Sequence, residues 1–318
     1  MFHLRLVPDN TKIPFMNGRF AGLITSAVLS IASLILFFHP GLNYGIDFRG
    51  GIVIEARTPQ APDFASLRHT LSGLGMGTVA LQEFGSPQDV LIRLERQPGD
   101  DAAQQVAADK VRGTLAQAIP GTQVRRVEAV GASVSGELFA NGMLALGLAM
   151  LAMLIYIWFR FEWQFGLGAV VTLLLDITKI VGFYAVTGLQ FNLVAVAAIL
   201  TIMGYSINDK VVVYDRMREN LRIYKKMPLR DLIDLSINET LNRTVGTSMC
   251  TFLSVIPLAL FGGEALQDFG IVLLLGVFIA TTSSIFIAAP ILLFLGENRL
   301  RRGAPVEGPA AKEPATTP

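Results

Sequence analysis

The chain has 318 residues, of which 52% are hydrophobic and only 16% are charged, and its formal net charge is +1. A soluble domain normally has about 25% charged residues, so this composition and the mean hydropathy of +0.52 predict a membrane protein. The basic residues stand in short blocks beside apolar runs, which does not favour binding to nucleic acid. The single cysteine, Cys250, excludes a disulfide framework or a thiolate metal site within one chain.

Runs of about 20 apolar residues, long enough to cross a hydrocarbon core of about 30 Å, predict transmembrane helices. Six such runs lie near residues 19–38, 138–159, 164–187, 191–214, 244–262 and 268–295. The first run is longer than the apolar region of a cleavable signal peptide, about 7–15 residues, and is expected to be retained. The chain is therefore expected to be an α-helical polytopic membrane protein with six transmembrane helices.

Lys and Arg residues are distributed unequally between the connections of these helices. They precede the first helix, follow the sixth and crowd the connection between the fourth and fifth, whereas 187–192 and 262–270 contain none. The positive-inside rule then places both termini in the cytoplasm and the long segment 39–136 outside it.

Three further parts of the chain complete this layout. Residues 1–18 form a cytoplasmic N-terminus, and the charged segment at about 215–240 is predicted to continue helically and form a surface helix near the lipid headgroups. Residues 137–298 carry the second to sixth helices. The tail at 299–318 is rich in Pro, Ala, Gly and Thr, and we expect it to be disordered.

Residues 39–136 have the pattern of one folded α+β domain. Strands are predicted at 45–58, 78–84, 90–96 and 122–130, and helices at 63–74 and 100–119. The Gly50-Gly51 pair interrupts the first strand, and a turn is expected at 85–87. The order β-α-β-β-α-β is that of a ferredoxin-like domain, which by itself implies no function.

Three motifs, taken in chain order, resemble the SecD/SecF family of protein-export membrane subunits, which is related to the resistance-nodulation-division superfamily. They are Gly45-Ile46-Asp47-Phe48-Arg49-Gly50-Gly51, the run Gly204-Tyr205-Ser206-Ile207-Asn208-Asp209 continuing to Asn220, and Glu239-Thr240-Leu241-Asn242-Arg243-Thr244 with Phe261-Gly262-Gly263. The second motif is similar to the SecF form of the family. Lys210 departs from this pattern, because the family usually has a small hydroxyl residue there.

The resemblance implies a role that composition and periodicity do not reveal. A SecF-type subunit pairs with SecD, assists the SecYEG channel and the SecA motor in the bacterial inner membrane, and uses the proton-motive force to promote preprotein translocation. It is not an enzyme, and neither a cofactor nor a metal is expected. The sequence has no phosphate-binding loop, so the energy would come from an ion gradient or a partner.

Charged residues inside membrane helices are the candidate functional residues, because each costs about 2.5–3.5 kcal/mol on insertion scales. The family implicates positions matching Asp209 and Arg243 in proton use, which makes Asp209 the expected proton carrier and Arg243 the neighbour that adjusts its proton affinity. Helical spacing adds Tyr205 and Asn208 beside Asp209 as a supporting polar path. Thr247 and Thr251 similarly follow Arg243 on one face. A structural ion pair with packing hydroxyls is the alternative.

Asp176 and Lys179 lie three residues apart and are expected to neutralise each other, which favours a structural role for Asp176. Asp176 also matches an acidic position that is common in the third helix of the family, and the resemblance therefore adds it to the supporting polar path. Lys210 points about 100° away from Asp209 around its helix and is expected to meet another chain. Asp47 and Arg49 are predicted to lie on the same side of a strand.

Two other classes of function stay open at this point. One is half of a resistance-nodulation-division exporter of small molecules, although about a hundred external residues leave little room for the large porter domains of such exporters. The other is a membrane hydrolase using Asp176 and Asp209, which would require the two carboxylates to face each other closely.

Overall fold

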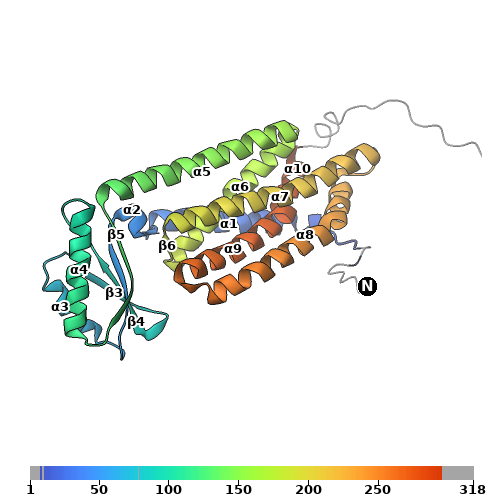
Figure 1. Ribbon diagram of the computed structural model, residues 1–318. Coiled ribbons are helices and arrows are strands. Elements are labelled where there is room, and N and C mark those ends of the chain that lie inside the picture. Colours follow the sequence, from blue (N-terminus) through green and yellow to red (C-terminus); the bar gives the residue numbers. More distant parts are fainter. Residues whose placement is uncertain (1–7, 9–10, 78, 296–318) are drawn as a thin grey trace, which may run out of the picture. The chain divides into compact units, whose positions relative to one another are not determined.

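The computed structural model describes residue 8 and residues 11–77 and 79–295 (Figure 1). The predicted disordered tail at 299–318 lies outside the described residues. The structure divides into two compact units, which we call the bundle unit and the sheet unit. The bundle unit comprises the described residues up to His39, Met150–Phe183 and the described residues from Ala198 onward, and the sheet unit comprises the described residues of Pro40–Ala149 and Tyr184–Ala197.

Within the described residues, six helical segments are long and apolar enough to cross a membrane, as the sequence predicted. Their helices are α1 (Arg19–Phe38, after a 3-10 turn η1 at Phe15–Gly18), α5 (Ala132–Arg160), α6 (Trp163–Thr187), α7 (Leu193–Ile223), α8 (Leu229–Phe261) and α9 (Gly263–Ser283). The last segment continues through a π-helical turn, η2 (Ser284–Ala288), into α10 (Ala289–Leu295). Many of their outward side chains are large and apolar, as contact with lipid requires.

The prediction of a separate surface helix at about 215–240 is wrong. The prediction that the fourth membrane helix continues into this region is correct. Residues 215–223 extend α7, and α8 begins at Leu229 after a short turn. The periodic apolar residues of this region are buried between the two helix ends, with Leu232 and Ile233 at most 1% exposed. Asn220 of α7 donates to the hydroxyl of Ser236 of α8 at 3.0 Å. The apolar stripe therefore packs within the chain.

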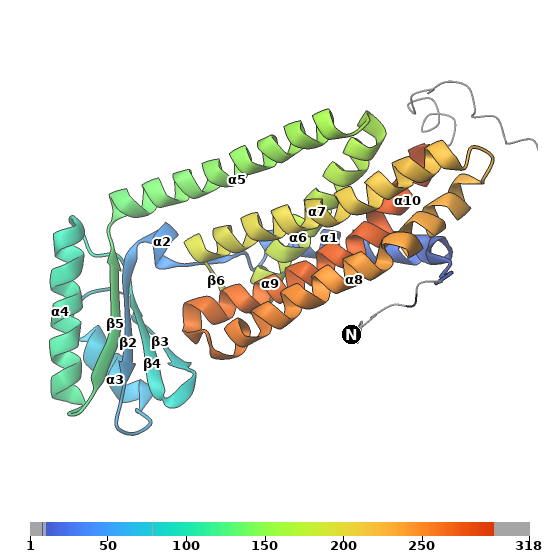
Figure 2. The ribbon, with the colours of Figure 1, turned by 45° about the vertical axis from the view of Figure 1, so that its right-hand side comes forward.

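The sheet unit contains a four-stranded antiparallel sheet in the order β3-β4-β2-β5. Its elements are β2 (Gly51–Arg57), α3 (Phe64–Ser72), β3 (Val79–Phe84), β4 (Ser86–Leu94), α4 (Asp101–Ala118) and β5 (Gln123–Val130). Helices α3 and α4 cover the same face of the sheet (Figure 2). Ile52 and Ile54 of β2 alternate inward onto Leu71 of α3 and Leu115 of α4 in its core.

Local capping explains where the two covering helices begin. Asp63 accepts a hydrogen bond from the amide of Ala65 at 2.9 Å, and Asp100 accepts one from the amide of Ala103 at 3.1 Å. Each carboxylate satisfies an amide that the first helical turn leaves unpaired. The predicted turn at 85–87 is shorter than expected, because Gly85 alone turns the chain with a φ of +72° and β4 already begins at Ser86.

The prediction of one strand through Asp47 and Arg49 is wrong. Residues Ile46–Arg49 form a single helical turn, α2, and the strand β2 begins only at Gly51. Gly50 and Gly51 have φ angles of +72° and +121°. A Cβ on Gly51 would lie 2.7 Å from the carbonyl oxygen of Leu94, and one on Gly50 would lie 3.1 Å from that of Val130. The pair thus lets the chain turn from α2 into the crowded centre of the sheet.

Asp47 and Arg49 instead hold other parts of the sheet unit. The carboxylate of Asp47 accepts a hydrogen bond from the amide of Leu193, the first residue of α7, at 3.0 Å. Arg49 lies over the ring of Tyr44 at 5.6 Å. Tyr44 belongs to β1 (Asn43–Tyr44), which pairs in parallel with β6 (Gln190–Phe191) just before α7. The glycine motif is therefore tied to the N-terminus of α7.

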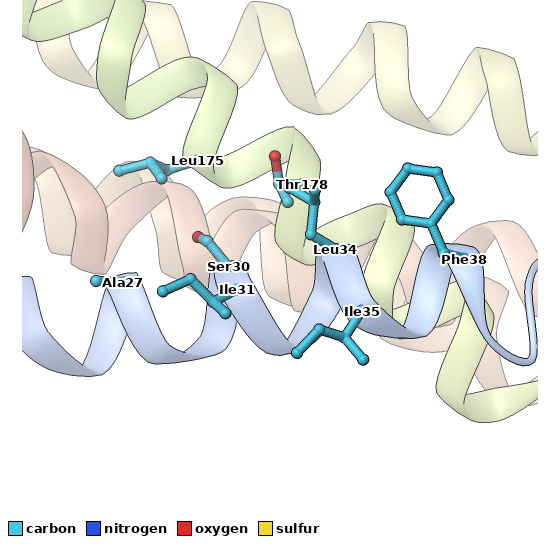
Figure 3. Close-up of a pocket in the computed structure, with 8 residues that line it drawn as sticks. All are labelled: Ala27, Ser30, Ile31, Leu34, Ile35, Phe38, Leu175 and Thr178. Atoms are coloured by element: carbon cyan, nitrogen blue, oxygen red, sulfur yellow. The ribbon is translucent and has the colours of Figure 1, made fainter.

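Helices of the bundle unit approach closely where a glycine replaces a larger side chain. A Cβ on Gly182 of α6 would lie 2.0 Å from the hydroxyl of Ser33 of α1, and one on Gly276 of α9 would lie 2.3 Å from Ile202 of α7. Beside the first contact, α1 and α6 leave an apolar groove of about 450 Å³ (Figure 3). Ile31 and Leu34 line it, and such a lining suits a surface that faces lipid tails.

Candidate proton-coupling site

Asp209 lies in the middle of α7 and is 4% exposed. Its Oδ2 accepts a hydrogen bond from the hydroxyl of Ser284 at 3.0 Å. The side chain of Thr244 of α8 faces the same carboxylate without completing a hydrogen bond. Among the described residues, no Lys, Arg or His nitrogen lies within 4 Å of this carboxylate. Asp209 is thus a buried acidic group held by one hydroxyl.

Ser284 is the first residue of the π-helical turn η2, and Pro290 lies two residues after the last residue of that turn, Ala288. Proline lacks an amide proton and cannot continue the α-helical hydrogen bonds before it. Single π-helical turns inside α-helices occur frequently at functional sites. The irregular turn therefore places a hydroxyl donor against Asp209.

A short chain of hydroxyl groups runs beside this carboxylate. The hydroxyl of Tyr205 lies 3.0 Å from that of Ser248 of α8, which in turn lies 2.7 Å from that of Thr281 of α9. The hydroxyl of Ser284 lies within hydrogen-bonding distance of two acceptors, the carbonyl oxygen of Thr281 at 2.8 Å and Oδ2 of Asp209 at 3.0 Å. Three helices thus contribute polar groups to one region of the bundle unit.

The remaining predicted residues of the polar path point elsewhere. Arg243, Thr247 and Asn208 are exposed, and Thr251 is half-buried. The hydroxyls of Thr247 and Thr251 bond back to carbonyl oxygens of their own helix, at 3.0 and 2.9 Å. The face of α8 that meets α7 carries Thr244 and Ser248 instead, which directly follow Arg243 and Thr247 in the sequence. Arg243 is near enough to Asp209 to act on it through its charge, but forms no ion pair within 4 Å among the described residues.

Asp176 of α6 has very different surroundings. It is 1% exposed, and its Oδ2 lies 2.9 Å from the ammonium of Lys210. The hydroxyls of Ser206 and Ser283 donate to the same oxygen at 2.9 and 2.7 Å. Lys179 lies 3.5 Å from Oδ1, which agrees with the pairing expected from their spacing. This cluster leaves the carboxylate compensated in charge and hydrogen-bonded.

The expectation that Lys210 meets another chain is wrong. Its side chain is 1% exposed and points from α7 to Asp176 of α6, about 100° around the helix from Asp209. Sequence reasoning did not identify Ser206, Ser283 and Ser284 as partners of the two aspartates. Serine is common in membrane helices as a packing residue, so only the interruption of the sixth helix before Pro290 could have drawn attention to the last two.

The comparisons with known proteins agree with this architecture. The family model for the C-terminal part of the protein export membrane proteins SecD/SecF matches residues 110–298, and the SecD/SecF GG motif matches residues 35–60. A protein translocase subunit SecF from Rickettsia bellii is 43% identical over 303 residues, covering 95% of this chain and 99% of the relative. The one from Rhodobacter capsulatus is 44% identical over 310 residues, covering 94% and 93%.

A solved structure has a similar fold. The crystal structure of SecDF, a translocon-associated membrane protein from Thermus thermophilus, has a TM-score of 0.82 at 30% identity and covers 91% of this chain. This chain corresponds to 39% of the length of that protein.

A polytopic helical membrane protein with an inserted α+β unit is thus the class that the fold and the site define. The chain belongs to the SecD/SecF family of protein-export membrane proteins, and its match to SecF subunits over nearly its full length favours that branch over small-molecule exporters.

Proposed function

We propose that this chain works with a SecD-type subunit in the bacterial inner membrane and uses the proton-motive force to promote preprotein translocation through SecYEG and SecA. Family membership supports the translocase role and the pairing with SecD. The buried, sparsely partnered carboxylate of Asp209 supports proton coupling.

The proposed orientation has both termini in the cytoplasm and the four-stranded sheet outside it. The excess of Lys and Arg before α1, between α7 and α8 and after α10 supports this orientation. The order of elements and the sheet order β3-β4-β2-β5 support a ferredoxin-like domain.

Asp209 is the proposed proton carrier because its surroundings allow a change of protonation. An ionised carboxylate deep in a membrane needs partners. Within the part of the chain that the structure describes, Asp209 has one hydroxyl donor, and the positive charges lie farther away. A proton on this group removes the cost of burying the charge. The hydroxyls of Tyr205, Ser248 and Thr281 are close enough to relay a proton with ordered water.

Arg243, Asn208, Thr247 and Thr251 are proposed to act on the face that the SecD-type subunit covers. Polar side chains on the outside of a membrane helix are costly in lipid and are usually covered by protein. If the SecD-type subunit covers this face, a shift of α8 would move the charge of Arg243 toward the carboxylate of Asp209 or away from it. One proton crossing a potential of 100 mV supplies about 2.3 kcal/mol, comparable to the cost of a buried charge.

The test is preprotein export in membrane vesicles, with and without a proton gradient. Asp209→Asn keeps the size and hydrogen bonding of the side chain but cannot carry a proton, so export should lose its dependence on the gradient while SecD still copurifies. Asp215→Asn is the matched control, because Asp215 lies on the same helix but is only half-buried and pairs with Arg160. Normal gradient dependence in Asp209→Asn would exclude Asp209 as the carrier.

A second variant tests Arg243. Arg243→Met removes the positive charge and should abolish the gradient dependence, and Arg243→Lys, which keeps the charge but loses the planar fork, should retain part of it. If Arg243→Met exports normally, or fails only because SecD no longer copurifies, Arg243 serves assembly and not coupling.

A further inference from the structure

The ammonium of Lys210 is surrounded by oxygen atoms in the interior of the bundle unit. Its Nζ lies 2.9 Å from Oδ2 of Asp176, 3.3 Å from the carbonyl oxygen of Ser206 and 3.3 Å from the hydroxyl of Ser283. It also contacts the hydroxyl of Ser206. These ligands come from α6, α7 and α9, and all of the side chains are at most 1% exposed.

The two serine hydroxyls turn their lone pairs toward this ammonium. Ser206 donates its single proton to Oδ2 of Asp176 at 2.9 Å. Ser283 lies within hydrogen-bonding distance of two acceptors, Oδ2 of Asp176 at 2.7 Å and the carbonyl oxygen of Ala280 at 3.0 Å. The charged and nearer acceptor forms the stronger bond. Both hydroxyls thus present only acceptor sites to Nζ, as ligands of a cation do.

Charge in this part of the bundle is balanced only when Lys210 is counted. Asp176 and Asp209 supply two buried carboxylates, and Lys179 and Lys210 supply two ammonium groups. Arg243, the next positive charge that acts on Asp209, is exposed. Removal of Lys210 would leave the two carboxylates with one buried lysine and a vacant oxygen-lined space.

We propose that Asp176, Ser206 and Ser283 form a binding site for a monovalent cation, which the ammonium of Lys210 occupies as a tethered cation. The covalent attachment closes the site to free ions in the protein as it stands. Truncation of Lys210 opens the site, and the variant then depends on a dissolved monovalent cation.

The geometry selects the class of ion. One carboxylate with neutral hydroxyl and carbonyl oxygens is a weak ligand set for Mg²⁺ or Ca²⁺, and three of the four oxygen contacts of Nζ, at 2.9–3.3 Å, are longer than the about 2.0–2.6 Å of those ions. Ammonium and K⁺ are therefore preferred over Li⁺ and over divalent ions. Lys179 and Ser283 also line a groove of about 460 Å³ between α1 and α9, which gives a small ion a route from the bundle surface.

The experiment measures the thermal unfolding of the full chain in detergent, at constant ionic strength. N-methyl-D-glucamine chloride is replaced stepwise by the chloride of NH4⁺, K⁺, Na⁺ or Li⁺. The unmodified protein should show no ion-specific change. Lys210→Ala should unfold at a lower temperature in N-methyl-D-glucamine and recover with NH4⁺ or K⁺ in a saturable manner, as binding to the folded state alone requires.

Two controls separate a site from a general salt effect. Lys179→Ala also removes an ammonium beside Asp176, but the recorded polar contact of Lys179 is Oδ1 alone, so this variant should show no ion-specific recovery. Lys210→Ala with Ser283→Ala lacks one ligand and should need about tenfold more K⁺ for half of the recovery.

Equal recovery with every salt, or no recovery in a folded Lys210→Ala variant, would overturn the proposal. Lys210→Ser supplies a second variant that retains an oxygen at the site. If neither variant can be extracted in a folded form with any of these cations, the oxygen cluster does not accept a free ion and the proposal is wrong.

Discussion

Asp176 and Asp209 are both buried aspartates in consecutive membrane helices, and they differ in almost every contact. Asp176 pairs with two lysines and accepts hydrogen bonds from two serines, whereas Asp209 accepts one hydrogen bond from Ser284. The first carboxylate therefore has partners that compensate its charge and its hydrogen-bonding capacity, and the second has few such partners.

This difference shows that burial alone does not identify the functional carboxylate of a membrane bundle. A group that several partners hold in one ionisation state contributes to structure, because any change would leave those partners unpaired. A group with few partners can change its state at a smaller cost. The ion pair between Asp176 and Lys210 also argues against the membrane hydrolase, because a carboxylate held by lysine is not free to act as a base beside Asp209.

The largest effect is expected from Lys210→Met, which removes the principal partner of Asp176. Loss of one partner of a buried ion pair should lower the free energy of unfolding by about 3–5 kcal/mol. Lys210→Met combined with Asp176→Leu removes both charges and should recover much of this loss, as denaturant unfolding can measure. If Lys210→Met alone is as stable as the unmodified protein, the cluster around Asp176 is not structural.

Gly276→Ala tests whether both clusters depend on the close approach of α7 and α9. The added Cβ would lie 2.3 Å from Ile202, one turn before Ser206, so overpacking should cost about 1–3 kcal/mol in unfolding free energy. Gly204→Ala on α7 is the matched control, since its nearest neighbour would be Met153 at 4.0 Å. Equal stability of the two variants would argue against tight packing at Gly276.

Ser283→Ala and Ser284→Ala separate the two aspartates most directly, because adjacent residues donate to different carboxylates. Ser283→Ala should lower the unfolding free energy by about 1–2 kcal/mol and leave the gradient dependence of export unchanged. Ser284→Ala should cost less stability and alter the gradient dependence. The reverse pattern would exchange the roles that we assign to Asp176 and Asp209.

The smallest effect is expected on the outer face of α8. Thr247→Val removes a hydroxyl that bonds only to its own helix among the described contacts, so the unfolding free energy of the isolated chain should change by at most about 0.5 kcal/mol. Ser248→Ala interrupts the hydroxyl chain between Tyr205 and Thr281 and should cost more. A larger loss in Thr247→Val would show that this face contributes to the bundle of a single chain.

The sequence by itself determined the six membrane segments and the helices and strands of the sheet unit, because apolar runs and hydrophobic periodicity are local properties. A glycine pair can also be recognised in the sequence, but the contacts made by the residues around it depend on distant parts of the chain. The Gly50-Gly51 pair was visible in the chain, whereas the hydrogen bond from the amide of Leu193 to Asp47 joins residues that are 146 positions apart.

Only the tertiary structure decided which polar groups meet in the bundle unit. Helical spacing placed Arg243, Thr247 and Thr251 on one face of α8, but it could not tell that this face is turned outward and that Thr244 and Ser248 face α7. It likewise separated Lys210 from Asp209 without identifying Asp176 as the partner of Lys210. The physical reason is that the period of a helix defines directions around its own axis, while the neighbour in each direction depends on how helices distant in sequence pack together.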